Sequence, residues 1–366
     1  MRTPTLSLFL LAAGCSGAVD PSGLEAIAAA QPPSAGGPVS REPDGGPAPT
    51  RGRDPTAPGD PGSSPDPVGP AEPDAGPIAP PAPPPAPPPP QLAPIFPASS
   101  PWNTRIDGEP VDPRSDAYIA EMGASTPLTA AWDAEGDGIP YVEVGSDQPM
   151  VPVSYWGFPD ESDPGPFPIP WSAPADPTMD RHVIVVDRER GFLYELFQGS
   201  RNADGSWAAS NGARWNLWSS RPRPLRWTSA DAAGLPVFPG LVRWDEVNSG
   251  WIGHALRFVV GHSQKGFVAP ATHAAGTCAL GSSCPPMGLR VRLKKDVDIS
   301  GFSWRMQVVL RALKEYGMFV ADNGGGTSWW LSGAPDPRFS DADTLSLGRI
   351  HGSDFEVVKH GPISSQ

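Results

Sequence analysis

The sequence predicts a mainly β fold, a β-sandwich or barrel-like arrangement, with one or two helices behind a long disordered proline-rich segment. Prolines and tryptophans separate along the 366-residue chain. More than half of the 51 prolines lie before Trp102, whereas all 13 tryptophans lie at or after it. Beyond residue 101, short apolar or alternating runs recur between glycine, proline and aspartate, which is typical of strands in such folds.

Composition excludes several classes of protein. Glycine has no three-residue period, which excludes a collagen-like helix. The sequence holds no apolar run near the ~18–20 residues of a spanning helix, which excludes a polytopic membrane protein. The formal net charge is −13, and a nucleic-acid partner would need a basic surface to neutralise its phosphates. We therefore expect no nucleic acid among the partners.

Residues 1–14 have the layout of a secretory signal peptide, with Arg2, an apolar run at 6–11 and small residues at 12–14. Cys15 follows, and the string Leu11-Ala12-Ala13-Gly14-Cys15 resembles the lipobox of bacterial lipoproteins. That resemblance implies cleavage before Cys15, acylation of its side chain and export to the cell envelope. The partner is then a membrane, reached through the N-terminal lipid, and Ser16 favours the outer membrane or cell surface. Ordinary secretion, with Cys15 incidental, is the alternative.

Residues 15–100 are predicted to be a disordered tether that starts at the lipidated cysteine. Residues 15–100 contain neither Trp nor Tyr, so they cannot bury enough apolar surface to offset the entropy of ordering. Their proline runs favour an extended polyproline II spacer. A ligand for a proline-recognising domain is the alternative function of such runs.

Residues 101–366 are predicted to form a single globular β-rich domain. The main helix is expected over 303–316, where Met306, Val309 and Leu313 share one face, Ser303 is a suitable N-cap and Gly317 a suitable stop. A second helix is expected at 114–122. The runs at 182–187 and 192–197 predict a β-hairpin across a charged turn. Further strands are expected at 141–144, 151–155, 213–217, 255–260, 288–293, 318–321, 328–331 and 356–358.

Cys278 and Cys284 enclose five residues. Export permits a disulfide between them, and its role would be to fix the surrounding loop. The spacing does not match a C-x-x-C zinc motif. We therefore predict a disulfide and no metal at these cysteines.

Common catalytic motifs such as G-x-S-x-G and H-E-x-x-H are absent from the sequence. Asp245 and Glu246 are adjacent carboxylates beside Trp244, and such a pair can supply a general acid and a general base. A surface loop that turns through charged residues is the alternative interpretation.

Three further residues are candidates for catalysis. His254 enters an alternating strand on the side of Leu256 and Phe258, where it could also be an ordinary core histidine. His273 precedes the disulfide loop. Asp322 ends an apolar strand and is followed by Asn323 and three glycines, which favours either a reactive carboxylate or a hairpin turn.

Alternating acids occur at Asp133, Glu135 and Asp137, followed by Gly138. They resemble the start of a calcium loop, but its twelfth position is Val144 instead of Glu. An acidic turn is the main interpretation and a metal site the weak alternative. No cofactor is predicted.

The tryptophans are the broadest indication of function. Aromatic faces beside polar groups are suited to sugar rings, although tryptophans also fill β cores. We expect substrate binding by Trp156, Trp244, Trp329 and Trp330. Stretches at 101–104, 138–141, 226–231, 240–246 and 352–357 resemble a family of secreted bacterial domains without an assigned activity. The resemblance implies one continuous domain and no particular reaction.

Two functions follow from these residues. The first is a surface-anchored lipoprotein that hydrolyses extracellular or cell-wall glycan through paired carboxylates. The alternative is a non-catalytic glycan-binding or adhesive lipoprotein. A polysaccharide is the expected partner in both cases.

Overall fold

The computed structural model describes residues 94–366 and is mostly β, as the sequence predicts. This part of the chain contains fifteen strands and four α-helices. The predicted signal peptide, Cys15 and the tether as far as residue 93 lie outside the described residues. Among the residues described, no helix has the length and apolar character needed to cross a membrane.

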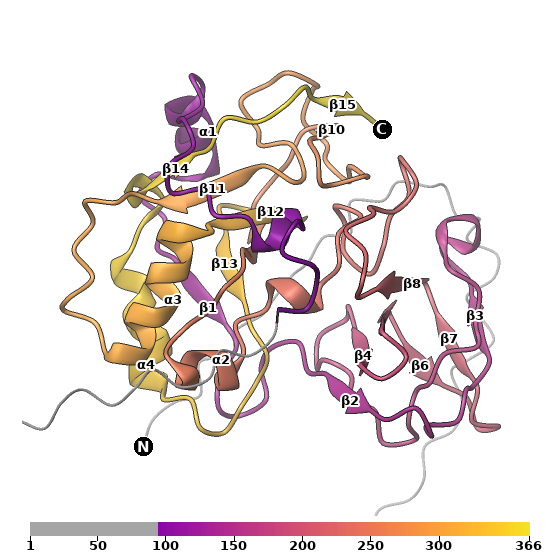
Figure 1. The fold of residues 1–366 in the computed structure, drawn as a ribbon. Coiled ribbons are helices and arrows are strands. Elements are labelled where there is room, and N and C mark those ends of the chain that lie inside the picture. Colours follow the sequence, from indigo (N-terminus) through magenta and orange to yellow (C-terminus); the bar gives the residue numbers. More distant parts are fainter. Residues whose placement is uncertain (1–93) are drawn as a thin grey trace, which may run out of the picture. The chain divides into compact units, whose positions relative to one another are not determined.

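The largest sheet has six strands in the order β1-β13-β9-β12-β11-β14. Its central strand, β9, runs parallel to β12 and antiparallel to β13. Figure 1 shows α3 and α4 on one side of this sheet and the smaller sheets on the other. The strands are β1 (Thr129–Ala131), β9 (Leu256–Val260), β11 (Arg290–Leu293), β12 (Met318–Asn323), β13 (Trp329–Ser332) and β14 (Phe355–Val357).

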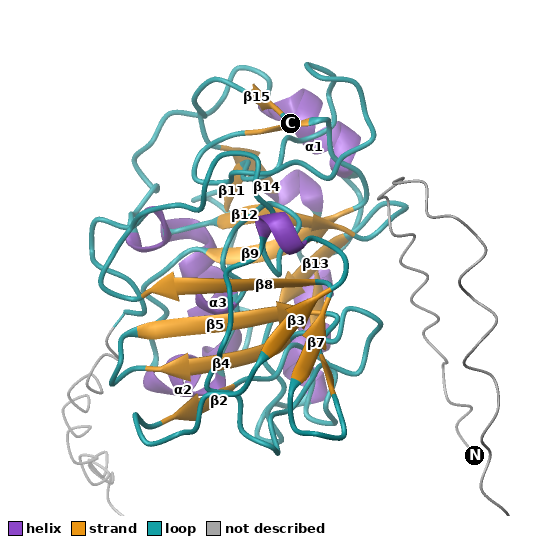
Figure 2. Ribbon diagram, turned by 90° about the vertical axis from the view of Figure 1, so that its right-hand side faces the viewer, coloured by secondary structure: helices purple, strands orange, loops and turns teal. Residues whose placement is uncertain are grey.

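A four-stranded sheet, in the order β2-β4-β5-β8, is covered on both faces. All five residues of β4 are buried. Val183 and Val185 enter a small core shared with β3 and β7, whereas Ile184 and Val186 enter the main core. Figure 2 shows the four strands in one layer with β3 and β7 beside them. The strands are β2 (Val142–Val144), β4 (Val183–Asp187), β5 (Phe192–Phe197) and β8 (Asn211–Asn216).

The remaining elements are short or lie at the periphery. The third sheet has the order β3-β7-β6, and β10 pairs with β15. In the third sheet, β3 is an edge strand. Pro152 directly before it favours this position, because proline cannot donate a hydrogen bond to a neighbouring strand. These strands are β3 (Val153–Tyr155), β6 (Ser200–Arg201), β7 (Trp207–Ala209), β10 (Gly266–Phe267) and β15 (Ser364–Ser365). The helices are α1 (Ser115–Met122), α2 (Trp244–Ser249), α3 (Trp304–Glu315) and α4 (Asp341–Ser346).

Several local predictions are confirmed. Helix α3 begins after Ser303, whose hydroxyl accepts a hydrogen bond from the Met306 N–H. Strands β4 and β5 form the expected antiparallel pair. Cys278 and Cys284 form the predicted disulfide. Helix α2, however, occupies the charged segment that the alternative interpretation assigned to a loop.

The glycine run after Asp322 does not close a hairpin. Strand β9 lies between β12 and β13, so the run passes over the end of β9 instead. The Gly324 N–H donates to the Val260 carbonyl and the Gly325 N–H to the Gly261 carbonyl. A Cβ at Gly261 would collide with the backbone of the run. Position 261 therefore requires glycine, because the backbone of the run approaches it closely.

Candidate functional site

One row of residues on the six-stranded sheet is open to solvent. Thr129 pairs with Trp330, Trp330 pairs with Val259, and Val259 pairs with Asp322. Thr129 is exposed, and the other three are partly exposed, although most of their neighbours along β9, β12 and β13 are buried. We call these four residues the open row. Directly paired residues point to the same face, which places Trp330 and Val259 on one surface. An irregularity between Val320 and Asp322 shifts the register of β12, so that Asp322 pairs with Val259 in the same row.

The open row has two chemically useful side chains, the indole of Trp330 and the carboxyl group of Asp322. The backbones of Trp330 and Asp322 are separated by two strand spacings, or about 10 Å. A Cβ on Gly324 would collide with the Trp330 ring, so that ring reaches toward the end of β12.

Asp322 is held in an environment that favours its protonated form. Its Oδ1 accepts the Asn323 N–H at 2.7 Å. Burial raises the pKa of Asp322 to about 7, and the negative charge of Asp231 adds to the effect. The charge of Asp180 acts in the same direction. Asp322 can therefore donate a proton near neutral pH.

A buried ion pair lies beside the open row. Arg257, two residues before Val259 on β9, donates from Nε to Asp231 Oδ2 at 3.0 Å and from Nη1 to Ser332 Oγ at 2.8 Å. Burial raises the pKa of Asp231 to about 6, although Arg257 opposes this shift. Because Asp231 is almost fully buried and bound to Arg257, it cannot itself reach a ligand.

His273 lies on the same loop framework as Asp231. Its Nδ1 is 2.7 Å from the carbonyl oxygen of Ala232, so Nδ1 carries the proton and Nε2 keeps a lone pair. In the described part of the chain, Nε2 has no hydrogen-bond partner. Burial lowers the pKa of His273, which keeps the imidazole neutral. The side chain therefore has the properties of a general base.

The backbone N–H and carbonyl of Ala233 link the end of β12 to the loop that carries His273. The Ala233 N–H donates to the Ala321 carbonyl, next to Asp322, and its carbonyl accepts the His273 N–H at 3.2 Å. Asn323 adds a direct link, because its Nδ2 donates to the Ala275 carbonyl at 3.3 Å. The backbones beside His273 and Asp322, which the sequence proposed separately, are thus linked through Ala233.

A second buried ion pair fixes the loop that carries Asp231. His182 Nδ1 lies 2.8 Å from Asp176 Oδ2, and its Nε2 lies 2.9 Å from the Ala230 carbonyl. Both acceptors require an N–H, so the imidazole is doubly protonated. Burial alone would lower the pKa of His182, but Asp176 outweighs it and raises the pKa to about 9. The pair anchors residue 230 beside the candidate site.

Asp245 and Glu246 are not a catalytic pair in this fold. Successive helical residues point about 100° apart, so at the start of α2 Asp245 faces solvent and Glu246 faces inward. Glu246 is bound to Arg243 at 2.5 Å and to His254 at 3.1 Å. Burial opposes ionisation of Glu246, but Arg243 and His254 lower its pKa to about 2. Glu246 and His254 therefore belong to a buried ion-pair cluster.

The four proposed substrate-binding tryptophans are scattered. Trp329 is fully buried with its ring centroid 5.0 Å from that of Phe355, which makes it a core residue. Trp244 is buried and its ring meets Phe339 edge-on at 5.0 Å. Trp156 is 64 % exposed. Trp330 is the member that lies in the open row.

The acidic alternation forms a turn. Asp133 Oδ1 accepts the N–H groups of Glu135, Gly136 and Asp137 at 2.8–2.9 Å. The carboxylate is therefore already satisfied by backbone donors. Within the described range, no group of three or more His, Cys, Asp or Glu side chains is placed to hold a metal ion.

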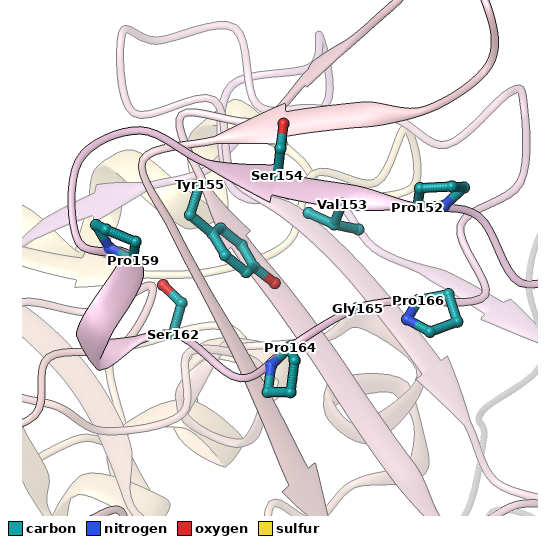
Figure 3. A pocket seen from close by; sticks show the side chains of 9 residues that line it. All are labelled: Pro152, Val153, Ser154, Tyr155, Pro159, Ser162, Pro164, Gly165 and Pro166. Atoms are coloured by element: carbon teal, nitrogen blue, oxygen red, sulfur yellow. The ribbon is translucent and has the colours of Figure 1, made fainter.

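A pocket of about 580 Å³ lies elsewhere, between β3 and residues 159–166 (Figure 3). Prolines, Val153, Gly165 and two serines line it together with Tyr155. The Tyr155 hydroxyl donates to the Asp163 carbonyl at 2.8 Å, and burial raises its pKa. Its lining thus contains no carboxylate or imidazole, so acid–base chemistry is better placed at the open row.

Sequence reasoning missed the charged residues that surround Asp322. Arg257 had a readable signal, because a charged side chain alternates there with Leu256 and Phe258 in an otherwise apolar strand. Asp231 and His182 had no comparable signal, since their partners come from distant segments.

No family model, curated protein or solved structure matches this chain. The chemistry of the open row therefore rests on its own geometry.

Proposed function

We propose that this chain is an exported, lipid-anchored protein whose β-rich domain hydrolyses extracellular or cell-wall glycan at the open row. The observation that carries the proposal is the shared row of Trp330 and Asp322 on an otherwise largely buried sheet. An indole supplies an apolar face for the C–H surface of a sugar ring. A carboxyl group that stays protonated near neutrality supplies a general acid.

The roles of the residues follow from their protonation states. Asp322 donates its proton to the glycosidic oxygen as the bond to the anomeric carbon breaks. His273 Nε2 accepts a proton from the water molecule whose oxygen bonds to that carbon. Arg257 and Asp231 support Asp322, because their ion pair fixes the loop and its charges set the pKa of the acid.

A non-catalytic glycan-binding protein is the second candidate. This alternative is favoured because Glu246 and Asp231 are both held in buried ion pairs. Asp322 then remains as the carboxyl group of the open row. A binding protein needs only the aromatic surface and fixed polar groups.

Glycan binding followed by product analysis separates the two functions. The wild type is compared with Asp322→Asn and Trp330→Ala, with Asp245→Asn as the matched control because Asp245 is exposed and 3.3 Å from Arg338. Cleavage that is lost in Asp322→Asn and retained in Asp245→Asn supports the hydrolase. Binding without cleavage in the wild type supports the binding protein. If the wild type neither binds nor cleaves any glycan, both functions are rejected.

The proposed lipid anchor has an independent test. Cells that express the full chain are labelled with palmitate, and the wild type is compared with Cys15→Ser. Labelling that disappears in the variant supports acylation at Cys15. Equal labelling of the two proteins would reject it.

A further inference from the structure

A second feature, separate from the open row, is a groove of about 540 Å³. It is bordered by the start of the described chain, the end of β8, the segment that follows β8 and the loop after Ala233. Trp102, Trp215 and Phe96 supply aromatic lining. We call this feature the arginine groove, because three of its four charged lining residues are arginines, namely Arg214, Arg221 and Arg223, and the fourth is Asp163.

Two of these arginines have unused hydrogen-bonding capacity. In the described part of the chain, the guanidinium groups of Arg214 and Arg221 make no hydrogen bond or ion pair. Arg214 lies over the Phe192 ring at 5.4 Å, and the Arg221 backbone is fixed by the Ser219 hydroxyl at 3.1 Å. Both are exposed. Each therefore presents donors for a carboxylate or sulfate.

The third arginine is structural. Arg223 donates to Asp163 at 2.5 Å, to the Glu161 carbonyl at 2.6 Å and to the Thr228 carbonyl at 2.8 Å. Its guanidinium also lies over the ring of Trp215 at 5.6 Å. These contacts neutralise Asp163 and fix the shape of the groove. The net positive charge of the groove therefore comes from Arg214 and Arg221.

The arginine groove and the candidate site share one loop. Gly234 and Leu235 line the groove, and a Cβ on Gly234 would lie 3.3 Å from the Cβ of His273. A polymer bound in the groove would therefore pass close to the loop that positions Asp231.

We propose that the arginine groove binds the carboxylate or sulfate groups of an anionic polysaccharide. This inference rests on the proposed function for the choice of glycan, and it adds that the substrate carries negative charge. Two free guanidinium groups in an acidic chain fit a ligand with one or two charges per binding site. A nucleic-acid surface would neutralise many phosphates, so that class fits less well.

The test measures binding of full-length protein to oligogalacturonate and to its fully methyl-esterified, neutral counterpart. The protein carries Asp322→Asn, so that cleavage does not interfere. The double variant Arg214→Gln/Arg221→Gln is compared with Arg188→Gln, a control that removes an exposed arginine paired with Glu143 at 3.0 Å. Loss of charge-assisted hydrogen bonds should weaken oligogalacturonate binding roughly tenfold or more in the double variant. The control should bind like its parent.

Sulfated oligosaccharide and single-stranded DNA are measured in parallel, at low and high salt. Binding that prefers either anionic glycan over the neutral one and weakens with salt supports the groove. Equal affinity for neutral and anionic glycan, or an unchanged double variant, would overturn it. Tighter binding of DNA than of both anionic glycans would overturn it as well. Because this is a binding assay, the absence of hydrolysis in the wild type rejects only the enzyme and leaves the groove result readable.

Discussion

Asp322 and Trp330 pair with the same residue, Val259, from opposite sides of strand β9. The two residues lie eight positions apart in the sequence, yet they do not belong to one hairpin. Because β9 lies between their strands, the carboxyl and indole groups stand apart across a partly exposed valine. The Trp330 ring reaches toward Gly324, which follows Asp322 and Asn323 in the chain.

The first prediction concerns the acid. Asp322→Asn should lower the rate of glycan hydrolysis by about 10²–10⁴-fold, the usual contribution of general acid catalysis. In the wild type, activity should fall as pH rises through about 7, because Asp322 then loses its proton. It should also fall at acid pH, where His273 becomes protonated. A pH–rate profile checks both limbs, and a flat alkaline limb would remove Asp322 from the role of acid.

The same substitution should increase stability above pH 7. The pKa of Asp322 is raised in the folded state, so folding at high pH costs the energy of keeping this partly desolvated group charged. Asparagine removes that cost. Thermal unfolding at pH 8 should show a higher midpoint for Asp322→Asn than for the wild type. At pH 3, where the wild-type group is protonated in both states, the two midpoints should converge.

The third prediction tests the neighbouring charge. Asp180→Asn removes a negative charge that raises the pKa of Asp322. The alkaline limb of the pH–rate profile should therefore move to lower pH. Asp245→Asn is the control, and its profile should coincide with that of the wild type. An unmoved limb in Asp180→Asn would show that this charge does not act on the acid.

Substitution of Trp329 should mainly lower stability, whereas substitution of Trp330 should mainly weaken glycan binding. Trp329→Ala removes a fully buried ring and should destabilise the fold by about 3–5 kcal/mol. Trp330→Ala removes a ring of the open row and should weaken glycan binding roughly tenfold, with a smaller loss of stability because Trp330 is partly exposed. Denaturant unfolding and glycan titration check the pair. Unchanged binding by a folded Trp330→Ala would contradict its role.

The buried His182–Asp176 pair predicts a pH dependence of stability. The pKa of His182 is raised to about 9, so its contribution is complete below about 6.5 and disappears as pH rises through 9. The pKa of Asp176 is lowered to about 2, so its contribution is lost as pH falls below about 4 toward 2. His182→Gln should cost about 3–5 kcal/mol between these limits. Unfolding from pH 5 to 10 should show the difference from the wild type shrinking at the alkaline end.

Much of the local structure followed from the sequence, because it depends on neighbouring residues. The Ser303 cap, the apolar spacing of α3 and the β4–β5 turn are all written within short segments. Helix α2 shows the limit of such reasoning. The run Trp244–Ser249 looks like a charged turn, and it becomes helical where Glu246 can bind Arg243 and His254 in the interior.

The sequence by itself determined the mainly β class, the main helix and the two cysteines that pair, since each depends on composition, periodicity or short spacing. It also nominated His273 and Asp322. The tertiary structure alone showed that Ala233 links the backbones beside these two residues and that Glu246 is held in a buried cluster with Arg243 and His254. The reason is physical: the pKa of Asp322 depends on burial and on the charges of Asp231 and Arg257, which reach it from other segments only when the chain is folded.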